Sequence, residues 1–385
     1  MFNGTKYRMW GKLKACLTFL FYIVCSCLAY GQYKGSSVTV GSTYGWDMVH
    51  AKTADKTNSL YGVQVQYARG LSHIDEEWIK TLNAKYFAAN LLWTDMQSMH
   101  EKVGENWYNH GHAIGLSAGV GFQLYQIGLV GFFLKPEVGL TYITKNIKTQ
   151  PETSTVGSAV NISLGAQLGI DIPLREDWGI TTDVGVLHYS NGGASIPNGG
   201  INAFRASLGL RKSFGTAPDQ NAGVVTGRKK APFKHLEGGH AELMVGLGVR
   251  GQYRSSDKKL YRSGIFTGYS YFVNPAIAVK AGADMVYYYT IYDAERHEET
   301  FQYFGSSYER VRVGLSGGLD IAMGRFVANG MVGRYLYYKS YYEDIRWYWT
   351  TGLRYYITTR IGVQSTLYMH RMQADFINWG LAFKM

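Results

Sequence analysis

The sequence predicts an all-β protein, namely a transmembrane antiparallel β-barrel in two tandem eight-stranded units. Apolar side chains alternate with Gly, Ser, Gln and charged residues in run after run from Ser36 to the last residue, which is the period of strands with two different faces. Most runs last roughly 9 to 13 residues, enough for a tilted strand to cross a bilayer. The composition agrees, because only 17% of the 385 residues are charged and 15% are aromatic, with 47 glycines and 7 prolines. Such a chain is too aromatic to be disordered and too interrupted by Gly for a bundle of membrane helices.

Residues 1–31 read as a signal peptide for secretion. A basic start precedes an apolar run and then small residues, and the run is too short for a comfortable transmembrane helix. All three cysteines, Cys16, Cys25 and Cys27, lie in this run, so the mature chain is expected to have no disulfide. A lipoprotein signal with Cys27 as the lipidated residue is the alternative, although the residues before it match the usual pattern poorly.

Residues 32–215 form the first predicted unit, with about eight alternating strands. Connections at 49–59, 97–111 and 146–158 are long, whereas those at 124–128 and 174–177 are tight. The 70–84 stretch breaks this alternation. Since hydrocarbon offers no water to backbone groups, only a closed barrel satisfies strands of this kind in a membrane.

A polar stretch at 216–239 is predicted to be a linker, after which the pattern resumes over 240–385 with about eight more strands. The spacing indicates an internal duplication. It leaves two architectures open, two eight-stranded barrels or one barrel of sixteen strands, and the second would resemble a porin-like channel.

The formal charge of +11 includes four residues of the predicted signal, Lys6, Arg8, Lys12 and Lys14. A modest basic balance suits nucleic acid or the phosphates of an anionic lipid. Because no basic run with interleaved aromatic residues is present, we expect membrane lipids as partners and no nucleic acid.

A candidate site lies in the predicted hairpin made by 178–190 and 202–214. On the first run His188 and Ser190 share a face with apolar even-numbered residues, and on the second run Asn202 also falls on the apolar face. Three polar groups on one apolar surface predict a function.

Their chemistry suits nucleophilic catalysis. Imidazole can take the proton of a serine hydroxyl near neutral pH, so His188 is the candidate base and Ser190 the candidate nucleophile. Asn202 can hold the ring in one tautomer, and the loop from Asn191 to Asn198 supplies donors for an oxyanion. The alternative is a barrel mouth whose polar residues only meet lipid headgroups.

The sequence His-Tyr-Ser-Asn-Gly-Gly from His188, followed by Pro-Asn-Gly-Gly-Ile from Pro197, resembles the active-site hairpin of the lipid A 3-O-deacylase (PagL) family. The resemblance implies an eight-stranded outer-membrane barrel whose catalytic residues face lipid. It implies His188 as base and Ser190 as nucleophile, with Asn202 at the position of the family's orienting glutamate. Its oxyanion-hole candidates fall on three residues: Asn191, Gly193 and Asn198.

By this resemblance, the expected function is a serine esterase of the bacterial outer membrane that removes an ester-linked acyl chain from lipid A, with no metal and no cofactor. The rival is a non-catalytic structural barrel in which the hairpin is a relic. The stretch from His370 to Gly380 resembles the end of longer family members and looks like a decayed copy of the hairpin, with Met372 where a serine would be needed. We expect no chemistry there.

Other candidate sites are weaker. His110 and His112 could bind a metal, but they lie in a predicted loop with no third ligand in view. Residues 75–77 are acidic and are predicted to be a solvated loop. No phosphate-binding loop or dinucleotide fingerprint is present in the sequence.

Overall fold

The computed structural model describes residues 35–48, 58–175, 177–214, 233–235, 238–252, 255–291, 309–339, 345–370 and 373–385. The predicted signal peptide, with its three cysteines, and most of the predicted linker lie outside these residues. In this part of the chain no helix is long and apolar enough to cross a membrane.

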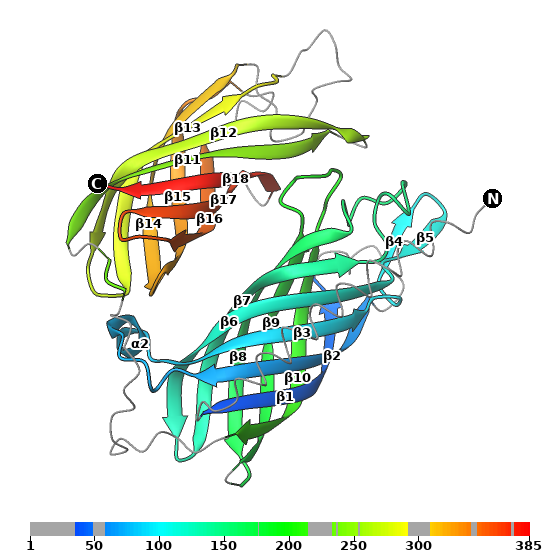
Figure 1. Cartoon of the computed structure of the whole chain (residues 1–385). Coiled ribbons are helices and arrows are strands. Elements are labelled where there is room, and N and C mark those ends of the chain that lie inside the picture. Colours follow the sequence, from blue (N-terminus) through cyan, green and yellow to red (C-terminus); the bar gives the residue numbers. More distant parts are fainter. Residues whose placement is uncertain are drawn as a thin grey trace.

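The first half forms a closed antiparallel barrel of eight strands in the order β1-β10-β9-β8-β7-β6-β3-β2 (Figure 1). The pairing of β1 with β10 closes it, with Ser36 opposite Phe214 and Asp47 opposite Ala203. The strands are β1 (Ser36–Asp47), β2 (Ser59–Gly70), β3 (Ala84–Asp95), β6 (His112–Ile127), β7 (Val130–Ile143), β8 (Val160–Pro173), β9 (Trp178–Ser190) and β10 (Ile201–Phe214).

The second half forms another closed barrel of eight strands, ordered from β11 to β18, with β18 paired to β11. Because each half closes on itself, the prediction of two tandem barrels is confirmed and the sixteen-stranded alternative is wrong. The strands are β11 (Gly239–Gln252), β12 (Ser255–Phe272), β13 (Ile277–Tyr288), β14 (Val311–Met323), β15 (Phe326–Tyr337), β16 (Trp347–Tyr356), β17 (Ile361–His370) and β18 (Gln373–Lys384).

Two connections of the first barrel hold structure of their own. The predicted loop 97–111 contains a two-stranded hairpin of β4 (His100–Val103) and β5 (Asn106–Asn109). The 70–84 stretch contains the short helix α2 (Glu77–Thr81), which packs Ile79 against Leu71 and Ala84. The prediction of a solvated loop at 75–77 is therefore wrong in part, since α2 begins at Glu77 and the carboxylate of Glu76 accepts a hydrogen bond from the Trp78 indole.

The strands present apolar side chains outward and polar ones inward, as the alternation predicted. On the outer face Leu140, Leu208 and Val332 are each about 60% exposed. In the first lumen Glu137 accepts hydrogen bonds from Arg205 (2.7 Å) and Gln167 (2.9 Å). A cavity of about 20 Å³ remains beside Glu137, room for about one water molecule. Side chains thus close this lumen at the level of Glu137, as in other small barrels, which argues against a porin-like channel through it.

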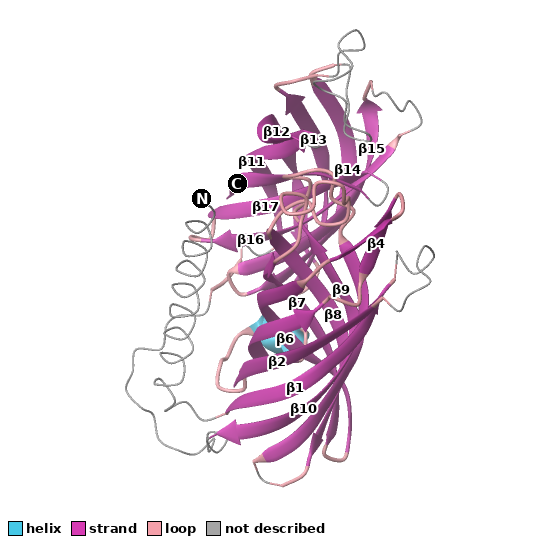
Figure 2. Ribbon diagram, turned by 90° about the vertical axis from the view of Figure 1, so that its right-hand side faces the viewer, coloured by secondary structure: helices cyan, strands magenta, loops and turns pink. Residues whose placement is uncertain are grey.

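The two barrels touch at both ends. At the end of the short turns, a Cβ on Gly324 between β14 and β15 would lie 3.1 Å from the Glu76 carboxylate, next to α2 (Figure 1). At the opposite end, the Gly251 amide of β11 donates to the Gly193 carbonyl of the β9–β10 loop (2.9 Å). In the view of Figure 2 the second barrel lies above the first.

Candidate functional site

The β9–β10 hairpin puts the predicted residues on the lipid-facing surface. His188 and Asn202 are directly paired across the two strands. Val184 and Val186, on the same face of β9, are 45% and 47% exposed, whereas Leu187 and Tyr189 point into the barrel and are buried. His188, Ser190 and Asn202 therefore share the outward face, as the strand period predicted.

His188 is oriented by Asn202. Its Nδ1 lies 2.7 Å from the Oδ1 of Asn202. Because an amide oxygen only accepts hydrogen bonds, Nδ1 carries the ring proton and Nε2 keeps its lone pair. This tautomer is the one that a general base requires.

Ser190 lies at the end of β9, among donors of the following loop. Its Oγ accepts hydrogen bonds from Asn198 Nδ2 (2.8 Å) and from the Gly192 amide (3.2 Å). No hydrogen bond joins Ser190 to His188 within the described chain, but the hydroxyl proton is not used by either bond and can turn toward the ring. Catalytic hydrogen bonds of this kind often tighten only when substrate is bound.

The loop brings together some predicted oxyanion donors and not others. Asn198 reaches Ser190 directly, and the Gly192 amide is a further donor that the sequence did not single out. Asn191 is buried, and its side chain donates to Ser195 O (3.0 Å) while accepting from the Gly193 amide (3.0 Å). Asn191 and Gly193 thus hydrogen-bond to each other in this structure and shape the loop.

A buried carboxylate supports the loop from the β4–β5 hairpin. Glu101 accepts hydrogen bonds from the amide (2.7 Å) and hydroxyl (2.6 Å) of Ser154 and from the amide (3.1 Å) and hydroxyl (2.7 Å) of Thr155. Burial raises the pKa of the Glu101 carboxyl, but these hydrogen bonds stabilise the carboxylate more, so its pKa lies below the usual value.

The segment that Glu101 holds is in turn bonded to the Asn198 region. The carbonyls of Ser154 and Thr155 accept hydrogen bonds from the amides of Gly199 and Gly200, each 2.9 Å long. The Gly157 amide donates to Asn198 Oδ1 (3.2 Å). Glu101 therefore helps to aim Asn198 at Ser190, a role that the sequence could not indicate because three separate loops contribute to it.

The possible metal ligands lie apart from this hairpin. His112 stacks on Trp93 and its Nδ1 is 3.6 Å from an Asp95 oxygen. Among the described residues, no group of three His, Cys, Asp or Glu side chains is arranged to hold a metal ion.

Comparison with known families covers both barrels. The family model for lipid A 3-O-deacylase (PagL) matches residues 57–211, and the model for the acyloxyacyl hydrolase C-terminal domain matches residues 239–385. The chain belongs to the PagL lipid A deacylase family. It is a protein of the bacterial outer membrane, and its family acts on lipid A.

Solved structures add little to this. The chain resembles the Pseudomonas putida toluene transporter TodX at 9% identity and a TM-score of 0.18, over 91% of this chain and 89% of that one. It resembles the Acinetobacter baumannii outer membrane protein Omp33 at 9% identity and a TM-score of 0.16, over 92% and 99% of the two chains. Likenesses this low carry no conclusion, and a comparison with curated proteins finds no match.

Proposed function

We propose that this PagL-family protein is a serine esterase that removes an ester-linked acyl chain from lipid A in the outer leaflet. The observation that carries the proposal is the outward-facing pair of contacts, His188 to Asn202 at 2.7 Å and Ser190 to Asn198 at 2.8 Å. A soluble enzyme would place such groups in a cleft, whereas these lie on the outward face of a barrel.

The first step forms an acyl-enzyme. The Ser190 Oγ attacks the acyl carbonyl while its proton passes to Nε2 of His188, and the imidazolium then gives that proton to the leaving sugar oxygen as the ester C–O bond breaks. Asn198 Nδ2 and the Gly192 amide, which now meet Ser190 Oγ, donate to the developing oxyanion. In the second step His188 takes a proton from water as the water oxygen attacks the acyl carbonyl, and it returns the proton to Ser190 Oγ as the acyl–oxygen bond breaks and the fatty acid leaves.

Asn202 supports this mechanism less strongly than the glutamate of its family would. An amide orients the ring but does not offset the positive charge that His188 acquires. We therefore expect slow catalysis with a correctly aimed base.

The surroundings suit an acyl ester at the membrane boundary. Phe204, two residues beyond Asn202 on the same face, stacks on Trp46 (ring centroids 4.6 Å apart), and Trp46 contacts Tyr44. Aromatic side chains of this kind mark the interface between headgroups and hydrocarbon in outer-membrane barrels. Val186, which pairs with Phe204 across the hairpin, and Val184 are exposed and offer an apolar surface to the acyl chain.

The test is mass spectrometry of lipid A from cells that express the chain, the Ser190→Ala variant or the control Ser42→Ala, which alters an exposed serine of β1. Loss of one acyl chain with the unaltered protein and the control, but not with Ser190→Ala, would support the esterase and its mass would name the acyl group. Heat-modifiable gel mobility checks that all three are folded. Unaltered lipid A in every case would instead favour a non-catalytic barrel with a relic site.

A further inference from the structure

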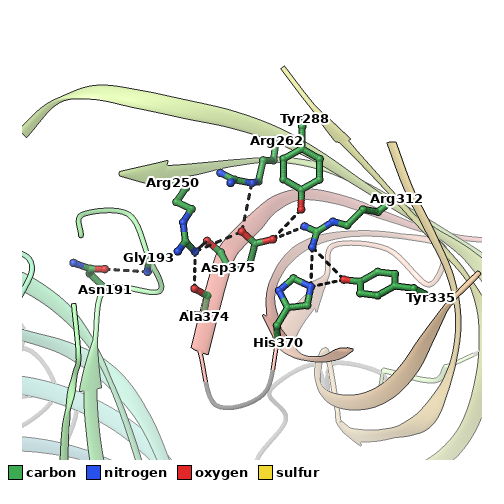
Figure 3. A network of polar contacts seen from close by, with 10 residues as sticks. All are labelled: Asn191, Gly193, Arg250, Arg262, Tyr288, Arg312, Tyr335, His370, Ala374 and Asp375. Carbon is green, nitrogen blue, oxygen red and sulfur yellow. Dashed lines mark hydrogen bonds and ion pairs between the residues drawn. The ribbon is translucent and has the colours of Figure 1, made fainter. Parts of the chain in front are cut away.

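The loop that carries the proposed oxyanion donors is seated on the rim of the second barrel. The Gly193 carbonyl accepts a hydrogen bond from the Gly251 amide (2.9 Å), and the next carbonyl, of Ala194, accepts one from Lys259 Nζ (2.7 Å). Figure 3 shows Asn191 and Gly193 on this loop facing Arg250 and the start of β18. Elements of both barrels are thus joined next to Ser190.

The approach is so close that side chains would prevent it. A Cβ on Gly192 (φ +64°) would lie 2.4 Å from Ile377 Cδ1, and a Cβ on Gly193 (φ +86°) would lie 2.8 Å from the Asp375 carbonyl oxygen. From the other side, a Cβ on Gly251 would lie 2.7 Å from Ser195 Cα. Both positive φ angles also favour glycine. The backbone conformation and the close packing therefore each require glycine at positions 192 and 193.

The receiving surface is itself fixed by a β-bulge. Tyr368 pairs with Phe376 and Met369 with Ala374, which leaves Asp375 as the extra residue of β18. Arg250 Nη1 donates to the carbonyls of Ala374 and Asp375, both at 2.7 Å.

The carboxylate of Asp375 points into the second barrel and anchors the bulge from below. It accepts a hydrogen bond from the Tyr288 hydroxyl (3.0 Å), forms an ion pair with Arg262 (3.4 Å) and contacts Arg312 (Figure 3). A bulge held by such charge-assisted bonds is a rigid support.

We propose that the second barrel is a positioning domain for the active site of the first, with Gly251, Lys259 and the Asp375 bulge holding the 191–195 loop so that Gly192 and Asn198 aim at Ser190. This inference rests on the proposed function for its catalytic consequence, but the contact itself is testable without activity. A displacement of about 1 Å in such donors can lower a rate by about 100-fold.

The first experiment tests the contact in the full chain. The predicted mature chain has no cysteine, so the pair Ala194→Cys with Lys259→Cys can be treated in outer membranes with a short bismaleimide and the joined peptides identified by mass spectrometry. The control pair combines Ala194→Cys with Lys339→Cys, because Lys339 follows β15, four strands from β11 in the closed order. Crosslinking of the first pair alone is expected, and equal or absent crosslinking would overturn the proposal.

The second experiment tests positioning. Gly251→Leu should displace the loop, whereas Gly330→Leu, on the outer face of β15 with nothing within 4 Å of its Cβ, is the matched control. Amide exchange of the peptide covering 191–200 should accelerate about tenfold in Gly251→Leu only, and kcat for deacylation should fall about tenfold or more with KM little changed. Lys259→Met should act in the same direction, and Lys259→Arg should restore both readouts.

The outcomes separate this inference from the proposed function. Unchanged exchange in Gly251→Leu overturns positioning, as does faster exchange with unchanged kcat. If the unaltered chain and Asn202→Glu both fail to deacylate lipid A, the proposed esterase function is wrong. Crosslinking and amide exchange would still decide whether the second barrel holds the loop.

Discussion

The β9–β10 hairpin of the first barrel and the β17–β18 hairpin of the second each join the last two strands of a barrel, and each carries a histidine near its tip. His188 faces outward and bonds to Asn202 across the hairpin. His370 faces inward, is 1% exposed, and meets Arg312 (2.7 Å) and the Tyr335 hydroxyl inside the lumen (Figure 3). His188 is therefore accessible from the outer face, whereas His370 belongs to the polar network inside the second barrel.

The bulge at Asp375 accompanies this difference. β9 and β10 pair without a register shift from Tyr189 opposite Ile201 to Trp178 opposite Lys212, which keeps His188 and Asn202 level on one face. The shift in β17–β18 turns Asp375 inward beside Phe376. Similar residues at corresponding positions of the two barrels thus have different roles, because the face on which a side chain lies depends on the register of strand pairing.

The largest effect on activity should come from replacing His188 with alanine, and the matched variant in the second barrel is His370→Ala. His188→Ala removes the base and should lower deacylation by about 10³-fold or more without destabilising the barrel, because the ring is at the surface. His370→Ala should retain most of the activity but lower the stability of the second barrel by about 1–3 kcal/mol, since it removes the buried ring nitrogen that both Arg312 and the Tyr335 hydroxyl meet. Lipid A mass spectrometry and urea unfolding would measure the two effects. The same loss of activity in both variants would break the comparison.

Removing the inward carboxylate of Asp375 should lower the stability of the second barrel more than His370→Ala does. Asp375→Asn leaves Arg250, Arg262 and Arg312 buried without their counter-ion, which should cost about 3–5 kcal/mol. Unfolding in urea, followed by gel mobility, would measure it against Asp75→Asn, whose side chain is 87% exposed and should change little. Equal stability of the two variants would show that the Arg cluster does not depend on Asp375.

A smaller and opposite effect is expected at Asn202. Asn202→Glu adds the negative charge that stabilises the His188 imidazolium, so kcat should rise about tenfold or more. Asn202→Gln, of similar size but uncharged, is the control. A gain with both residues would mean that reach, and not charge, limits the unaltered enzyme.

The smallest effect concerns Glu101. Its lowered pKa means that the carboxylate stabilises the 154–155 segment above about pH 4, the usual glutamate value, and that this contribution is lost as the pH falls through the lower folded pKa. Glu101→Gln should abolish this pH dependence and, at pH 7, accelerate amide exchange of the peptide covering 196–201 a few-fold, on the order expected for losing charge-assisted hydrogen bonds. Glu105→Gln, an exposed residue of the same hairpin, is the control. Identical amide exchange in the two variants would show that Glu101 does not support the position of Asn198.

Much of the molecule follows from local pattern alone. Alternation with period two predicted the strands and the outward face of His188, Ser190 and Asn202, and the lengths of the connections predicted the long and short ends of the barrel. Both signals depend on residues close together in sequence. The family motif named Ser190 and Asn198, which lie 2.8 Å apart in the structure.

Only the tertiary structure decided how many barrels the strands make, since closure depends on whether β10 returns to β1 or continues to β11. It also decided that Glu101 supports Asn198 and that Gly193 rests on Gly251, because each contact joins segments that are remote in sequence. The inward turn of His370 and Asp375 likewise required the register of two paired strands. The sequence of one strand determines which of its side chains alternate between the two faces. It does not determine which strand it pairs with or where a bulge interrupts that pairing.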